Sequence, residues 1–193
     1  MIRPIWLVAL WWLWLSSDQD AGKILRPQDG AALPSGEFSI IATAPGGKLL
    51  LDGEELQADQ PFPNVLQTKA SPAPGKHRLT LVWEDRRSEI NFFVGADPPA
   101  EFKPFRQHPP VSVECTQCHA VSRRGRLRFI GGCFSCHQQE TFPKSHHHPP
   151  HILEQCGQCH NAHGSTVKAH LILAREKACG LCHTAPGAVK QGR

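Results

Sequence analysis

Cys115-Thr116-Gln117-Cys118-His119 is the first of four stretches that share the pattern Cys-x-x-Cys-His. The others are Cys133-Phe134-Ser135-Cys136-His137, Cys156-Gly157-Gln158-Cys159-His160 and Cys179-Gly180-Leu181-Cys182-His183. They use all 8 cysteines of the 193-residue chain, and a His follows every pair. The second half of the chain is therefore built around these four motifs.

Two cysteines at this spacing with an adjacent His are the attachment signature of c-type haem, in which the thiols join the vinyl groups and the His binds the iron. Disulfides or zinc ribbons also use paired cysteines, but neither requires a His after each pair. We therefore predict four covalently attached haem c groups. The attachment residues are Cys115, Cys118, Cys133, Cys136, Cys156, Cys159, Cys179 and Cys182, and the proximal iron ligands are His119, His137, His160 and His183.

The N-terminal segment predicts export. Arg3 is followed by the apolar run Ile5 to Leu15. As a helix this run would extend roughly 17 Å, short of a bilayer core of about 30 Å. We expect a signal peptide over residues 1–21, with an uncleaved membrane anchor as the alternative. The expected location is the periplasm or the cell exterior, with membrane contact only if the segment is retained.

Composition divides the rest of the chain. Residues 22–96 contain no cysteine and one His, His77, whereas the other 11 His follow later. The Pro98-Pro99 and Lys103-Pro104 region is typical of a stiff linker. The predicted domains are a β-sandwich over 22–96, a Pro-rich linker over 97–107 and a tetrahaem cytochrome domain over 108–193.

Alternating apolar residues and turn signals predict strands in residues 22–96. Asp52-Gly53 is a typical hairpin turn. The alternating positions expected to be buried are Phe38, Ile40, Ala42, Leu79, Leu81, Trp83, Ile90, Phe92 and Val94.

The segments Ile24 to Gly30, Leu51-Asp52-Gly53 and Pro74 to Leu79 resemble a bacterial immunoglobulin-like domain, of the type at the C-terminus of penicillin-binding protein 1C. The resemblance implies a small sandwich and transfers no catalytic residue. The single His of this part, His77, is expected to be structural.

Charge divides the chain in the same way. Residues 18–100 hold 8 Lys and Arg against 12 Asp and Glu, whereas residues 101–193 hold 12 against 5. The basic run from Arg123 to Arg128 could contact nucleic acid. Pairing with haem propionates is the favoured interpretation, because four haems bring eight carboxylates. We expect no nucleic-acid partner.

The lead sequence His-Pro-Pro occurs before each pair of motifs, at His108 and at His148. The second pair resembles the doubled Cys-x-x-Cys-His domain of multihaem cytochromes, and the resemblance implies distal iron ligands at His148 and His163. In the first pair Ser122 replaces the second of these His. The stretch from His148 to Cys156 is also similar to that of tetrahaem class III cytochromes c, which implies that His148 and His151 both bind iron.

The predicted distal ligands are therefore His108, His148, His151 and His163, with His146, His147 and His170 in reserve. The only Met is Met1 and there is no Tyr, so neither is available as a distal ligand. Met ligation raises the reduction potential of a haem, so low-potential haems are expected.

The expected fold class is a small all-β immunoglobulin-like sandwich followed by a loop-rich, mostly α or irregular multihaem domain whose core is haem. The expected function is an exported electron carrier that exchanges electrons with redox partner proteins. Two alternatives remain at this point. One is a small multihaem reductase with an open haem site. The other is an assembly or filament subunit that docks or self-associates through its sandwich.

Overall fold

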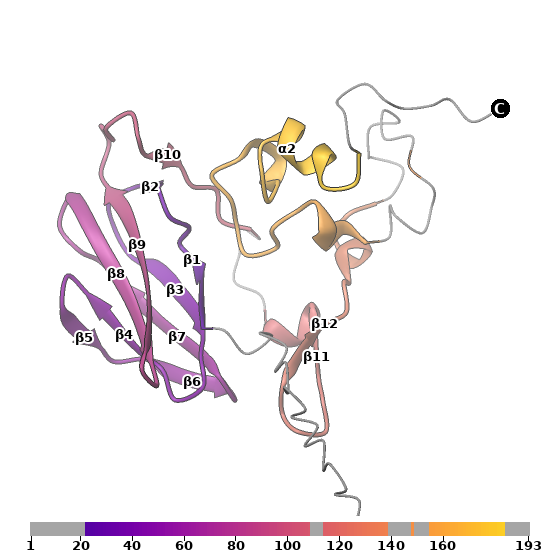
Figure 1. Cartoon of the computed structure of the whole chain (residues 1–193), viewed down its shortest axis with the longest axis horizontal. Helices are drawn as coiled ribbons and strands as arrows, with labels where there is room; N and C mark the ends of the chain where they lie inside the picture. The colour runs from indigo at the N-terminus through magenta and orange to yellow at the C-terminus, as the bar shows by residue number, and fades with distance from the viewer. Residues whose placement is uncertain (1–21, 109–113, 139–147, 149–154, 184–193) are drawn as a thin grey trace, which may run out of the picture.

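The fold comes from a computed structural model, which describes residues 22–108, 114–138, 148 and 155–183 (Figure 1). The predicted signal peptide lies outside the described residues, as do the candidate ligands His146, His147 and His151. Within the described residues, no helix is long and apolar enough to cross a membrane.

Two β-sheets form the first half of the molecule (Figure 1). The first sheet has the strand order β1 (Lys23–Arg26), β3 (Phe38–Thr43), β7 (Val65–Ala70) and β6 (Asp59–Phe62). The second has the order β10 (Lys103–Pro104), β2 (Ala31–Leu33), β9 (Arg86–Val94), β8 (Gly75–Trp83), β4 (Lys48–Leu51) and β5 (Glu54–Leu56). Neighbouring strands run antiparallel, except that β2 is parallel to both β9 and β10.

The core lies between these sheets and follows the alternation in the sequence. Leu79 and Leu81 are fully buried on β8, and Phe92 and Val94 are fully buried on β9. Residues two apart on a strand share a face, so each strand contributes one apolar row. From the first sheet Ile40 packs against the same cluster. Eight of the nine predicted positions are buried, and Phe38 is partly buried against the same core.

The predicted turn at Asp52-Gly53 joins β4 to β5. Its two residues have φ angles of 53° and 94°. Such angles suit Gly and are tolerated by Asp, which explains why this dipeptide closes the hairpin.

The segment predicted as a linker, 97–107, contributes β10 to the edge of the second sheet. The Lys103 N–H donates to Gly30 O at 2.8 Å, and the Phe105 N–H donates to Ala32 O at 2.9 Å. Phe102 is buried and its ring lies beside that of Phe93. This segment is therefore paired with the sandwich over its second half.

The described part of the second half consists of short elements. The 3-10 turns are η1 (Cys115–Gln117), η2 (Cys133–Ser135), η4 (Cys156–Gln158) and η5 (Lys168–His170). The strands β11 (His119–Val121) and β12 (Leu127–Phe129) form a hairpin, and α2 (Arg175–Gly180) is the one α-helix of the described residues.

The predicted fold class is wrong for this second half. In the described residues of this half, two short strands, four 3-10 turns and one short α-helix alternate with irregular segments, and the buried apolar residues belong to the sandwich and the β10 segment. These described residues show neither a mostly α domain nor a haem core. A Cys-x-x-Cys-His motif needs only one turn of backbone, and therefore does not demand a helix on either side. Helix α2 begins only at Arg175, and the earlier residues Ala169 and His170 have φ angles of 58° and 54°, which an α-helix does not allow.

Several contacts join the two halves. Arg106 and Ser165 exchange both backbone hydrogen bonds, each at 3.0 Å. The Thr166 N–H donates to the side-chain oxygen of Gln28 at 3.0 Å. Arg26 of β1 also reaches across to the second half. The motif-bearing half is thus packed against the β1 side of the sandwich.

Candidate haem sites

Each Cys-x-x-Cys motif forms one tight turn. In all four, the N–H of the second Cys donates to the carbonyl of the first at 3.2 Å. This bond spans three residues, which brings the two thiols of each motif onto one side of the turn. A single group with two attachment points is the kind of ligand that this arrangement suits.

The His that follows is held by the same turn in three motifs. The N–H groups of His137, His160 and His183 donate to the carbonyl of the first Cys of their motif at 2.8, 2.9 and 2.9 Å. The first motif differs, since His119 begins β11 and pairs with Phe129 of β12. A hairpin therefore fixes the first motif His, whereas a turn fixes the others.

No disulfide joins any of the eight cysteines. Among the described residues, no group of three or more His, Cys, Asp or Glu side chains is arranged to hold a metal ion. The motifs therefore do not gather into the four-ligand clusters of zinc ribbons in this part of the chain.

Three motif His face a non-motif His. The ring centroids of His119 and His163 are 6.0 Å apart, with 24° between the ring planes. Those of His137 and His108 are 5.8 Å apart at 16°. His183 and His148 form the third pair, at 6.2 Å and 40°.

These separations fit two imidazoles on opposite sides of one iron. A metal–imidazole bond is about 2 Å long and the ring centre lies about 1 Å beyond the nitrogen, so the two centres would be roughly 6 Å apart. The residues present therefore fit bis-His ligation at three motifs. The role of each His as a ligand stays a prediction.

The pairing skips the nearest motif in every case. His108 precedes the first motif but faces the His of the second, and His148 precedes the third but faces the His of the fourth. His163 follows the third motif and faces His119 of the first. The predicted ligand His151, a candidate partner for His160, lies outside the described residues.

Electrostatics favour neutral imidazoles at the first pair. Burial lowers the pKa of His119. Burial, His119 and the charges of Arg26 and Lys23 lower the pKa of His163 to about 4. Neutral imidazole is the form that binds a metal, so both rings are in the ligand form at neutral pH.

Backbone carbonyls orient several rings. The Nδ1 of His160 lies 2.7 Å from Ala169 O, and that of His108 lies 3.3 Å from Ala162 O. Such a bond leaves Nε2 for a metal. By contrast, the Nδ1 atoms of His119 and His170 are buried without a hydrogen-bond partner. Such an atom costs about 1–3 kcal/mol, so a hydrogen-bonding group is expected beside each of these two Nδ1 atoms.

Consecutive motifs are adjacent in space. The Ile130 N–H donates to Cys118 O at 3.0 Å, which joins the first motif to the segment that leads into the second. Burial, followed by the neighbouring Cys156 and Cys118, raises the pKa of the Cys133 thiol, so the second motif lies beside the third. The Ile172 N–H donates to Cys159 O at 2.9 Å. Burial, Cys182 and Cys179 raise the pKa of Cys159, so the third motif lies near the fourth.

Large apolar side chains are exposed beside the motifs. Two of them, Phe134 and Leu181, lie inside the second and fourth motifs. The others are Val121, Phe129, Ile130 and Leu173. A porphyrin is a large, flat apolar group, so exposed apolar side chains next to the thiols are compatible with haem.

The remaining candidates are placed as follows. His170, in reserve as a ligand, meets the His108 ring edge-on with centroids 5.1 Å apart. Ser122, which replaces the second family His, accepts a bond from the Arg126 N–H and so shapes the β11–β12 hairpin turn. Sequence reasoning missed Arg26, since nothing in its neighbourhood distinguishes it from the other arginines of the sandwich.

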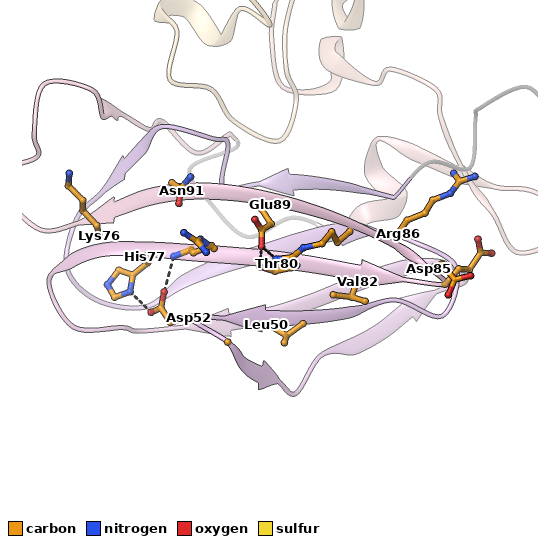
Figure 2. Close-up of a pocket in the computed structure, with 14 residues that line it drawn as sticks. Leu50, Asp52, Lys76, His77, Thr80, Val82, Asp85, Arg86, Glu89 and Asn91 are labelled. Atoms are coloured by element: carbon orange, nitrogen blue, oxygen red, sulfur yellow. Dashed lines mark hydrogen bonds and ion pairs between the residues drawn. The ribbon is translucent and has the colours of Figure 1, made fainter.

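A separate hollow lies on the outer face of the second sheet and contains no motif residue (Figure 2). Its volume is about 850 Å³, and β4, β8 and β9 line it. There the two ring nitrogens of His77 lie 2.7 Å from Asp52 Oδ2 and 2.7 Å from Ala73 O. This bonding supports the structural role predicted for His77.

The comparisons with known proteins address each half separately. Residues 148–188 match the family described as the doubled CXXCH motif. The match supports covalent binding of c-type haem and indicates a multihaem cytochrome that carries electrons. The matched stretch contains the third and fourth motifs with His148 and His163.

The chain is also similar to a fibronectin(III)-like module of CbhA from Clostridium thermocellum. The identity is 21%, the TM-score is 0.32, and the match covers 38% of this chain and 95% of that module. No curated protein matches the chain.

Proposed function

We propose that this chain is an exported tetrahaem c-type cytochrome that transfers electrons through closely spaced, low-potential, bis-His haems. The observation that carries the proposal is the set of three imidazole pairs, each joining a motif His to a non-motif His at 5.8 to 6.2 Å. Two cysteines that form no disulfide precede every motif His.

In this proposal each side chain has one task. The two thiols of a motif attach one haem, and the motif His binds its iron from the proximal side. His163 completes the site of His119, His108 that of His137, and His148 that of His183. His151 is assigned to His160. Bound haem supplies one-electron exchange at iron, and the protein sets ligation, spacing and exposure.

Two features support low potentials and fast internal transfer. Met1 is the only Met, so distal Met ligation, which raises potentials, is not available to the motif half. Backbone bonds tie the first motif to Ile130, three residues before the second, and the third motif to the segment after it. Little protein therefore separates one redox centre from the next.

The proposal includes location and partners. The apolar run after Arg3 supports export to the periplasm or the cell exterior. The donor and the acceptor are redox proteins. The exposed arginines of the β11–β12 hairpin, Arg123, Arg124, Arg126 and Arg128, are assigned to pairing with haem propionates.

Absorption spectra of the purified protein, oxidised and reduced, with and without carbon monoxide, test the proposal. Bis-His haems are low-spin and have no free site, so carbon monoxide should leave the reduced spectrum unchanged. Full binding at one haem would favour the reductase alternative. A spectrum without haem bands would end the proposal. A variant with Cys179 and Cys182 replaced by Ser is the matched control, and should lose one quarter of the haem absorbance.

A further inference from the structure

We infer that Arg26, on β1 of the sandwich, is a positioning residue for two distal ligands of different haems, His108 and His163. The inference deepens the proposed function and rests on its assignment of these ligands. It also gives the sandwich a task in the cytochrome, because the side chain that orders the ligands belongs to a sandwich strand.

The guanidinium of Arg26 donates to both ligand residues. Its Nε donates to His163 O at 2.8 Å, and its Nη2 donates to His108 O at 2.9 Å. Its Nη1 donates to the hydroxyl of Ser39 at 2.9 Å. Because the guanidinium is planar and rigid, these three bonds fix the two carbonyls relative to each other and to β3.

A bulge in β1 directs Arg26 toward the motif half. The β1–β3 register shifts between Ile24 and Arg26, which pair with Ala42 and Ile41. Without the bulge, Arg26 would share the core-facing side of Ile24, since residues two apart share a face. A bulge re-aims side chains, and the contact with Ser39 shows the new direction. Ser39 precedes the fully buried Ile40 and therefore lies on the outer face of the sheet.

Arg26 is buried, with 8% of its surface exposed. Among the described residues no carboxylate forms an ion pair with it, so backbone carbonyls and one hydroxyl satisfy its charge. Burying a charge with neutral partners is costly. Fixing two ligand-bearing segments at once is a task that accounts for an Arg at this place.

Backbone hydrogen bonds also join the segment that contains His108 to the segment that contains His163. Arg106 and Ser165 exchange backbone bonds two residues away from His108 and His163, respectively. Gly164 has a φ of 119°, and a Cβ there would lie 2.5 Å from the Phe105 ring. The backbone bonds between Arg106 and Ser165 do not hold the carbonyls of His108 and His163 against the sandwich. Arg26 does so by donating to both carbonyls.

The sandwich also forms one wall of the first site. A cleft of about 350 Å³ is lined by Lys23, Ile24 and Leu25 of β1 on one side and by His119 and His163 on the other. Strand β1, which carries Arg26, therefore also borders the first imidazole pair. Loss of Arg26 should therefore change the ligation and spin state of the haem irons, and not only the overall stability.

The test uses the full-length holoprotein with Arg26→Met, which keeps the apolar stem and removes all three bonds. The haem count per chain should stay the same, because no attachment residue changes. Up to two haems should gain high-spin character and bind carbon monoxide in the reduced state. Arg26→Lys keeps the charge and one donor, and should restore part of the low-spin signal. Arg87→Gln on the exposed surface of β9 is the matched control and should leave every spectrum unchanged.

Low-spin haems with no carbon monoxide binding in Arg26→Met would overturn the inference, even if the melting temperature falls, because a merely structural role predicts that result. If neither Arg26 variant accumulates, Ser39→Ala decides. This variant removes the hydrogen bond between Arg26 and Ser39. A larger fraction of carbon monoxide-binding haem than in the wild type supports the inference, and an equal fraction overturns it. Failure of the proposed function itself would appear already in the wild type, as absent or high-spin haem.

Discussion

Replacing Phe102 with Ala should destabilise the sandwich, although Phe102 belongs to the segment that the sequence marks as a linker. The side chain is 7% exposed, and its ring centroid lies 5.9 Å from that of Phe93. The ammonium of Lys76 lies 5.7 Å from the same ring. Burial of a Phe contributes about 1.5–3 kcal/mol. Truncation of a fully enclosed Phe costs about 3–5 kcal/mol. Because Phe102 lies at the sheet edge, the expected loss is about 2–3 kcal/mol.

Urea unfolding of a fragment covering residues 22–107 measures this loss without haem. Small domains have slopes of about 1 kcal/mol per molar urea, so the midpoint should fall by roughly 2–3 M. Lys103→Ala is the control, because Lys103 is exposed and its backbone bond to Gly30 persists. Its effect should stay within about 0.5 kcal/mol. Equal midpoints for the two variants would show that the Phe102 side chain does not stabilise the sandwich, and the reasoning would fail.

Three further predictions concern the ligands and the sandwich. His108→Ala should keep all covalent haem but turn the haem of the second motif high-spin and open to carbon monoxide, whereas His77→Ala should change no haem band. Gly164→Ala should perturb the low-spin signal of the first motif, since its Cβ would lie 2.8 Å from Arg106 O and its φ of 119° disfavours a side chain; a wild-type Raman spectrum would contradict this. Burial raises the pKa of Asp52, but hydrogen bonds from the His77 ring and the Arg78 N–H lower it by more. The pKa of Asp52 therefore lies below its usual value. The stabilisation is therefore present above about pH 4 and lost as pH falls through the folded pKa, and urea midpoints of the 22–107 fragment should show this acid loss shrinking in Asp52→Asn.

Local pattern predicted much of the sandwich. The alternation at Leu79 and Leu81 places both side chains in the core, and Asp52-Gly53 closes a hairpin as expected. Pairing between distant segments was not predictable in this way. The composition around Lys103-Pro104 is typical of a linker. The segment forms a strand because the folded chain brings it beside β2, with which it pairs.

In the motif half, too, local features were predictable from the sequence and long-range contacts were not. Spacing identified the thiols and the candidate His, because attachment chemistry fixes them locally. It could not tell that His163 faces His119, since that depends on the path of the chain across 44 positions of sequence separation, as their residue numbers show. The mostly α expectation failed because each motif needs a single turn, and the segment after the first motif pairs as a hairpin instead. The role inferred for Arg26 depends on a bulge that no composition pattern marks.

The intact mass of the denatured, purified chain tests the central claim most directly, because thioether-bound haem survives unfolding. The account predicts the mass of the polypeptide plus four haem groups, and plus three when Cys179 and Cys182 are both replaced by Ser. A polypeptide mass without haem, or one reduced by the hydrogens lost to four disulfides, would contradict it.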